Sequence, residues 1–244
     1  FRRARDVYRR IAELPNVEAV GVDMHIGSQI TDLEPFGNAF GLMAELVTAL
    51  RGDGHGIEHV DVGGGLGIPY HHDQEAPPHP EAYAAVVRDK VGQLGCSLVI
   101  EPGRLLVGNA GILVTRVEYV KRGETDFVIV DAAMNDLIRP TLYEAHHDIM
   151  PVNHSNLAPI TGDIVGPVCE TGDYLARGRT IPGVAEGDLL AVMSAGAYGA
   201  VMASTYNSRP LVPEVLVDGS RWHVIRPRKP IEELLALDSV PDWL

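Results

Sequence analysis

IEHVDVGGGLG, residues 57–67, is a mostly apolar strand-like run that leads directly into a cluster of glycines. The same arrangement occurs twice more, in VEAVGVDMHIGSQ (17–29) and in SLVIEPGR (97–104). Mostly apolar strands are typical of a parallel sheet whose two faces are both covered. The three stretches therefore predict three buried strands that each end in a glycine-containing turn.

Amphipathic helices are predicted around these strands, because apolar residues recur at helical spacing in 1–14, 33–51 and 80–94. In the second of these helices the apolar stripe consists of Phe36, Phe40, Met43, Val47 and Leu50. Alternating helix and strand signals are typical of βαβ units, whose parallel strands all end at one edge of the sheet. In a βα barrel that edge carries the active site. We therefore expect the three glycine clusters to meet at one rim, where backbone N–H groups can bind a phosphate, although a glycine cluster can also be only a tight turn.

The sequence pattern changes at about residue 113. Short alternating runs separated by Gly- and Pro-containing turns follow: ILVTRVEYVK, TDFVIVD, DIVGPV, DLLAVM and PEVLVDGSRWHVIR. Such runs without a strong helix predict an antiparallel β domain. PIEELLALD (230–238) predicts one short helix that starts at Pro230. We therefore predict a parallel α/β part over 1–112 and a β domain over 113–244.

Composition and charge narrow the class of protein. The 244 residues are 45% hydrophobic and 22% charged, as in globular proteins, and carry a net charge of −13. This charge argues against a nucleic-acid partner or an anionic membrane surface. No apolar run approaches the ~20 residues that span a bilayer, and no hydrophobic signal region follows the basic start. We expect a cytoplasmic protein that binds a small molecule or another subunit.

No metal site or disulfide is predicted. Cys96 and Cys169 lie far apart in the sequence and lack the spacing of metal ligands. Four histidines that form no metal-binding pattern are interpreted as loop or surface residues: His71, His72, His146 and His147.

Six motifs follow one another along nearly the whole chain. They are HIGSQI (25–30), DVGGGLGI (61–68), EPGR (101–104), DAAMNDLIRPTLY (131–143), GPVCETGD (166–173) and SAGAYG (194–199). In content and order they resemble the alanine-racemase-like (fold type III) pyridoxal-phosphate decarboxylases, and within them the branch that acts on diaminopimelate. The resemblance implies part of a TIM-type (β/α)8 barrel followed by an antiparallel β domain. It also implies conversion of meso-2,6-diaminopimelate to L-lysine and carbon dioxide, with pyridoxal 5'-phosphate as cofactor.

By this resemblance the cofactor lies at the glycine-rich rim. Its phosphate would be held by small residues, namely Ser28, Gly64, Gly65 and Gly103, and the same site would include Pro102, Arg104 and Tyr198. Glu101 would face the pyridine nitrogen, where a carboxylate favours the protonated, electron-accepting ring. His25 would stack on the ring, although a strand-end histidine can also be purely structural.

The later motifs imply a site for a diamino acid. Arg104 and Arg139 with Tyr143 would hold the distal carboxylate, because the planar guanidinium suits bidentate contact. Glu170 would meet the distal ammonium group.

The resemblance also implies a proton donor and a dimer. Cys169 would protonate the substrate Cα and would come from the partner subunit, so that a homodimer shares its active sites. A lone cysteine is more often a small core residue, but its setting in GPVCETGD favours the catalytic interpretation. Tyr198 would touch both cofactor and substrate.

The chain departs from the family in one respect. A βα barrel needs eight strand–helix units in ~250 residues, whereas only three complete strands are predicted here. The family carries its cofactor-binding lysine in an early barrel strand, and none of Lys90, Lys121 and Lys229 has that setting. We therefore expect that the chain begins within a helix, that it lacks the segment with this lysine, and that it is inactive alone.

Two alternatives stay open at the level of sequence. The chain could be a truncated, non-catalytic partner of a decarboxylase, although such a partner has no need of Cys169 and Glu170. It could also derive from a decarboxylase of a related diamino acid, such as ornithine or carboxynorspermidine. Arg139 argues against ornithine, which has no distal carboxylate.

Overall fold

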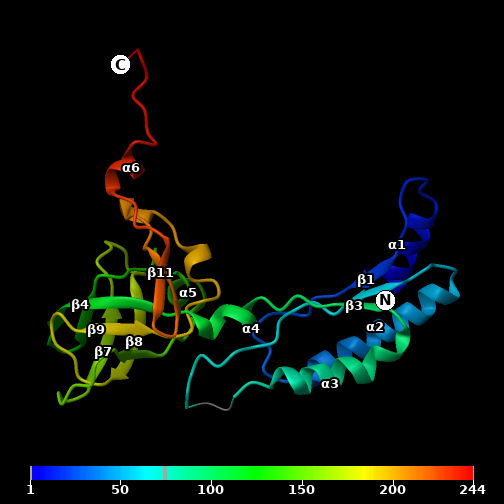
Figure 1. Cartoon of the computed structure of the whole chain (residues 1–244), viewed down its shortest axis with the longest axis horizontal. Coiled ribbons are helices and arrows are strands. Elements are labelled where there is room, and N and C mark those ends of the chain that lie inside the picture. The colour runs from blue at the N-terminus through cyan, green and yellow to red at the C-terminus, as the bar shows by residue number, and fades with distance from the viewer. Residues whose placement is uncertain (1, 74–75, 244) are drawn as a thin grey trace. The chain divides into compact units, whose positions relative to one another are not determined.

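The computed structural model describes residues 2–73 and 76–243, and these divide between Val107 and Gly108 into two compact units (Figure 1). The division falls at a 3-10 helix, Gly108–Ala110, which precedes the first long strand of the second unit.

The first unit is built on a three-stranded parallel sheet. Its elements in chain order are α1 (Arg2–Ala12), β1 (Gly21–Asp23), α2 (Glu34–Gly52), β2 (His59–Asp61), α3 (Pro80–Lys90), a 3-10 helix (Gly92–Leu94), β3 (Ser97–Val99) and α4 (Arg104–Val107). The strand order is β1-β2-β3, with Val22, Val60 and Leu98 in register. The predicted parallel sheet and its helices are confirmed, but each strand is shorter than its apolar run.

The core of this unit lies between the sheet and one face of α2. The predicted stripe is buried in full: Phe36, Phe40, Met43, Val47 and Leu50. The ring of Tyr83 on α3 packs edge-on against Phe36, with the centroids 5.1 Å apart, and α2 and α3 pack against each other (Figure 1). Each fully buried large apolar side chain stabilises the fold by about 2 kcal/mol. This packing fixes where the three strands end.

The expectation that every strand is covered on both sides is wrong for β3. Leu98 and Val99 of β3 and the following Ile100 are 50%, 44% and 51% exposed, so the described residues cover neither face of this edge strand. Beside this edge lies a pocket of about 340 Å³, lined by the glycine run, by α3 and by Leu98, Ile100 and Leu105.

The second unit is a β domain. Its elements are β4 (Leu113–Lys121), β5 (Asp126–Val130), α5 (Arg139–Tyr143), β6 (Ile149–Pro151), β7 (Ile160–Val165), β8 (Tyr174–Ile181), β9 (Leu189–Val192), two 3-10 helices (Ala200–Met202 and Tyr206–Ser208), β10 (Glu214–Asp218), β11 (Arg221–Arg226) and α6 (Ile231–Leu235). Six strands form one sheet in the order β6-β9-β4-β5-β7-β8, and β10 and β11 form a hairpin. The side chains of β4, β5, β7, β8 and β9 supply most of its apolar core.

Two predictions for this unit need correction. The sheet is not wholly antiparallel, because β5 and β7 pair in parallel with Val128 opposite Ile164. Strands β6 and β8 and helix α5 were missed. Helix α5 is only five residues long and thus too short for a periodic pattern, and Gly178 interrupts β8 with a positive φ of 54°.

Across the described residues, no helix combines the length and apolar character needed to cross a membrane. Both cysteines are free thiols.

Candidate functional site

Three turns interlock at the carboxyl ends of β1, β2 and β3. The Met24 N–H donates to the Asp61 carbonyl at 3.1 Å, the Glu101 N–H donates to Gly63 at 2.9 Å, and the Ile30 N–H donates to Gly65 at 2.9 Å. These bonds join the segment after each strand to its neighbour. The predicted rim therefore exists, and backbone hydrogen bonds hold it together.

The glycine run is required by this close approach. A Cβ at Gly64 would lie 2.3 Å from the Glu101 carbonyl oxygen, and one at Gly65 would lie 2.2 Å from the Gly27 carbonyl oxygen. Gly65 also has a φ of +97°, which side chains rarely adopt. Only glycine fits at these positions, so the run shapes the backbone as well as leaving it open to a ligand.

His25 and Glu101 meet at the rim. Nδ1 of His25 lies 3.7 Å from the Glu101 carboxylate and accepts a hydrogen bond from the Gly64 N–H at 3.3 Å. Because Nδ1 is an acceptor, the neutral ring carries its proton on Nε2. Both side chains are about half exposed, so each presents a polar group at the open side of the rim.

Arg104 links two further groups of the rim. Its Nη2 donates to Ser28 Oγ at 2.8 Å, and its Nη1 donates to the Tyr70 hydroxyl. A cation and a hydroxyl in contact are the groups that bind a phosphate. Tyr70 was missed, since it lies in a Gly- and Pro-containing loop with no pattern to single it out.

Three carboxylates also gather here, from Asp23, Asp61 and Glu101, with oxygens within 4.8 Å of one another. Asp23 and Asp61 are the last residues of parallel strands, and Glu101 lies two residues beyond β3. One Asp61 oxygen accepts the Gly63 N–H at 2.9 Å. The group could hold a cation by its geometry, but exposed carboxylates commonly gather without one.

In the second unit the segment Gly166–Asp173, here called the cysteine loop, carries Cys169 and Glu170. The buried carboxylate of Asp173 fastens it, because one oxygen accepts the Val168 N–H at 2.6 Å and the other accepts the Met134 N–H at 2.7 Å. Asp173 thus ties the cysteine loop to the segment before α5. Sequence reasoning did not predict this role, although Asp173 is the last residue of the motif GPVCETGD.

Helix α5 joins the cysteine loop directly. Thr141 Oγ1 donates to the Gly172 carbonyl at 2.5 Å. Arg139 and Tyr143 are the first and last residues of this one-turn helix; Arg139 is 6% exposed and Tyr143 is 60% exposed. The structure therefore ties the helix that carries Arg139 and Tyr143 to the loop that carries Glu170.

Glu170 and Cys169 are both exposed on the loop. The Tyr206 hydroxyl donates to Glu170 Oε2 at 3.3 Å. The charge of Glu170 and this hydrogen bond raise the pKa of Tyr206 above its usual value. Tyr206 was missed because it lies outside the six motifs.

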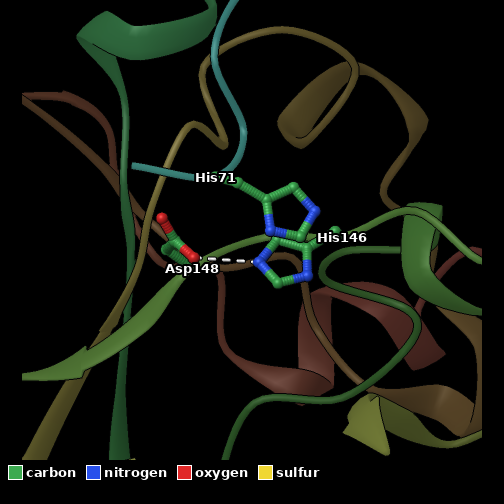
Figure 2. A group of neighbouring side chains, drawn as sticks. All are labelled: His71, His146 and Asp148. Carbon is green, nitrogen blue, oxygen red and sulfur yellow. Dashed lines mark hydrogen bonds and ion pairs between the residues drawn. The ribbon is translucent and has the colours of Figure 1, made fainter. Parts of the chain in front are cut away.

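His147 was interpreted as a loop or surface residue, and of these two possibilities only the loop is confirmed. It lies in the loop after α5, as predicted, but it is fully buried, with Nε2 2.7 Å from Arg139 Nη1. Burial lowers its pKa from 6.5 to about 4. A loop pattern carries no burial signal, so the sequence could not show this. The neighbouring His146 lies 2.9 Å from an Asp148 oxygen (Figure 2).

A second, partly buried network supports the segment before α5. Arg209 donates to Asn135 Oδ1 at 2.9 Å and to the Asp131 carbonyl at 2.7 Å, and it also reaches Asp136 at 3.3 Å. The pKa of Asp136 is raised above its usual value, because desolvation outweighs the lowering by the Ala133 N–H and by Arg209. These bonds fix the approach to Arg139.

Tyr198 lies on the turn 194–199 with a φ of +59° and a 40% exposed side chain. The turn is fastened by Asn109, whose amide donates to Ser194 Oγ at 2.7 Å. The predicted site residues divide between the two units. The first unit carries His25, Ser28, Gly64, Gly65, Glu101, Pro102, Gly103 and Arg104, and the second carries Arg139, Tyr143, Cys169, Glu170 and Tyr198.

Comparisons with known proteins agree on one family. Residues 7–196 match the family model described as pyridoxal-dependent decarboxylase, C-terminal sheet domain. The chain is 53% identical over 238 residues to a diaminopimelate decarboxylase of Pseudomonas aeruginosa and 50% identical over 242 residues to one of Zymomonas mobilis. These matches cover 97% and 99% of the chain, but 57% of each relative.

A solved structure gives the same result. Diaminopimelate decarboxylase from Helicobacter pylori, complexed with L-lysine, is similar with a TM-score of 0.89 at 38% identity. The match covers 97% of this chain and 58% of that one. The chain therefore corresponds to somewhat more than half the length of these relatives.

Proposed function

Because the chain belongs to the pyridoxal-dependent decarboxylases, we propose that it forms the larger part of an enzyme that converts meso-2,6-diaminopimelate to L-lysine and carbon dioxide. The similarity to diaminopimelate decarboxylases along 97% and more of the chain supports this assignment. We further propose that the first unit is the C-terminal part of a (β/α)8 barrel and that the second is its β domain. Free thiols at Cys96 and Cys169 suit a reducing compartment such as the cytoplasm.

The residues of the rim fit pyridoxal phosphate. The phosphate would lie against Ser28, Arg104 and the backbone of Gly64, Gly65 and Gly103, where an arginine and a hydroxyl are already in contact. Pro102 belongs to the same turn. The exposed carboxylate of Glu101 would face the ring nitrogen, and His25 and Tyr198 would contact the ring. Bound there, the cofactor supplies an electron-accepting ring that stabilises the charge left on Cα when carbon dioxide departs.

The arrangement around α5 is the observation that carries the choice of substrate. Thr141 ties α5, with Arg139 and Tyr143, to the cysteine loop that carries Glu170. A cation and a carboxylate are thus held on two segments that bond to each other. They would recognise the distal carboxylate and the distal ammonium of a diamino acid, with Arg104 as a second cation. Such a pair suits diaminopimelate, whereas ornithine offers no distal carboxylate.

Cys169 would complete the reaction. Its exposed thiol would deliver a proton to Cα after carbon dioxide has left and would regain the proton from solvent. Asp173 and Tyr206 would hold the cysteine loop and Glu170 in position for this step. The residues of this chain thus bind, orient and protonate the substrate.

The test is a substrate comparison with the full-length protein that contains this chain. We expect its kcat/KM for meso-diaminopimelate to exceed that for ornithine by several orders of magnitude, because an unmatched buried cation is costly. L-lysine and carbon dioxide should form in equal amounts. Equal or better turnover of ornithine, or of carboxynorspermidine, would contradict the assignment and favour the related decarboxylase.

We also propose a homodimer whose active sites combine both subunits. The observation that supports it is the placement of the proton donor in the β domain, whereas the proposed cofactor residues other than Tyr198 belong to the first unit. Two full-length variants test it: Cys169→Ala, and one that lacks the cofactor-binding lysine. Each should be inactive alone, and mixing them should restore about a quarter of the wild-type activity through hybrid sites. No recovery in heterodimers that have been shown to form would contradict shared sites.

A further inference from the structure

The buried imidazole of His147 contacts the arginine that the proposed function assigns to the substrate. Arg139 Nη1 lies 2.7 Å from Nε2 of His147, and the Met193 carbonyl oxygen lies 2.8 Å from its Nδ1. Arg139 is 6% exposed and His147 is 0% exposed. All three residues belong to the second unit, on α5, on the loop after it and just beyond β9.

These partners determine which ring nitrogen carries the proton. A guanidinium only donates, so Nε2 must accept from Arg139; a carbonyl only accepts, so the Nδ1–H must donate to Met193. The ring is therefore neutral. Burial, with the nearby charges of Arg139 and Arg179, lowers the pKa of His147 to about 4 and keeps the ring neutral near pH 7.

The backbone of His147 is fixed as well. Arg179 Nη1 donates to the His147 carbonyl at 2.9 Å, and its Nη2 donates to Nδ1 of His146 at 2.7 Å. Because that nitrogen accepts, His146 carries its proton on Nε2 and donates it to Asp148 at 2.9 Å (Figure 2). Hydrogen bonds thus hold His147 at both ring nitrogens and at its carbonyl.

We propose that His147 is a positioning residue that orients the Arg139 guanidinium without neutralising it. The inference rests on the proposed function, because it takes Arg139 as the group that reads the distal carboxylate. A carboxylate at this place would orient the arginine equally well, but it would cancel its charge and compete with the ligand. A neutral acceptor fixes the plane of the guanidinium and does not cancel its charge. His147 therefore contributes to the selection of a diamino acid with a distal carboxylate.

The experiment compares two nearly isosteric variants of the full-length holoenzyme, His147→Gln and His147→Glu. Both keep an oxygen that can accept from Arg139, but only glutamate adds a negative charge. The probes are the product L-lysine and cadaverine, which is L-lysine without its carboxylate.

In the glutamate variant the inhibition constant of L-lysine and the KM for diaminopimelate should rise about tenfold or more, since a competing carboxylate weakens the ion pair. In the glutamine variant both should stay within about threefold. Cadaverine inhibition should be unchanged in both.

A purely structural role would give another result. Both variants would then be impaired alike, and cadaverine would weaken as much as L-lysine; either outcome overturns the proposal. Thermal unfolding tests whether each variant folds. If neither variant folds, a crystal structure of the wild-type protein with L-lysine replaces the comparison. In that structure Arg139 must contact both His147 Nε2 and the ligand carboxylate. A guanidinium that contacts only one of them overturns the proposal. The two possible failures can be told apart. If the wild-type enzyme neither decarboxylates diaminopimelate nor binds L-lysine, the proposed function itself is refuted. If the wild-type enzyme does both but the two His147 variants behave alike, only the role of His147 is refuted.

Discussion

Single buried polar residues decide whether the second unit has a usable site. Neither Asp173 nor His147 is among the predicted site residues. The hydrogen bonds of Asp173 nevertheless hold the cysteine loop, and His147 holds Arg139. Buried polar groups of this kind are costly when one partner is lost, because the remaining donor has no water to replace it.

The stability of the protein should depend on pH through His147. Its pKa is lowered from 6.5 to about 4 in the folded state. The unfolded chain therefore binds more protons between these values, so the free energy of unfolding rises with pH across this window and stays level above it. The contribution fully present above pH 6.5 and lost by about pH 4 is on the order of 3 kcal/mol. Urea unfolding of the wild type and of His147→Gln at several pH values measures it as the difference between the two slopes. Parallel slopes would contradict the prediction.

Asp173→Asn should destabilise the second unit by about 2–4 kcal/mol, because an amide nitrogen would replace one acceptor and leave a buried backbone N–H without a partner. The Cys169 thiol should then react faster with a thiol reagent, since the loop that carries it is loosened. Asp218→Asn, at the exposed hairpin, is the matched control and should change neither property. Thermal unfolding and thiol labelling measure both effects, and a variant as stable as the control would show that Asp173 does not fasten the loop.

At the scale of elements, the ends of the strands are determined by backbone contacts at the glycine run. Gly64→Ala should destabilise the first unit by about 2 kcal/mol or more, because the new Cβ would lie 2.3 Å from the Glu101 carbonyl oxygen. Gly41→Ala is the matched control: it lies within α2 with nothing within 4 Å of the added atom, and it should gain about 0.5–1 kcal/mol. Denaturant unfolding compares them. Equal effects would show that the close approach is not required.

How far the sequence predicts the elements depends on what each pattern records. The stripe of α2 and the glycine-ended strands repeat over enough residues to predict helices, a parallel sheet and a rim. Helix α5 has one turn and β8 carries two register shifts in its pairing with β7, so neither keeps a period. The contacts of Tyr70, Tyr206 and His147 join residues far apart along the chain or in irregular loops, and no local pattern records such contacts. The six motifs supplied the predicted site residues, but they did not indicate the groups that hydrogen-bond to them.

For the whole molecule, the positions of the three lysines lead to a prediction about the chain of residues 1–244. In the first unit Lys90 ends α3, which leads back to the amino end of β3 and thus away from the rim, and its amine pairs with Asp89 at 2.9 Å. Lys121 lies over the Phe127 ring, and Lys229 pairs with Glu233 at 2.8 Å.

Mixed with pyridoxal phosphate and borohydride, this chain should form no specific adduct and release no carbon dioxide from diaminopimelate. Mass spectrometry of the peptides locates any adduct, and stoichiometric labelling of one of these lysines with turnover would contradict the prediction.

The parallel pairing of β5 with β7 sets the order in which the second unit can fold. A hairpin cannot make such a pair, so the chain between Val130 and Ile160 must first cross from one end of the sheet to the other, and this crossing segment carries Arg139 and His147. Closing a long loop costs conformational entropy before any pairing rewards it, which slows folding. His147, the partner of Arg139, therefore reaches its own partner, the Met193 carbonyl beyond β9, only after most of the chain has been synthesised. During refolding, β-sheet signal should recover before ligand binding does, because the site forms last.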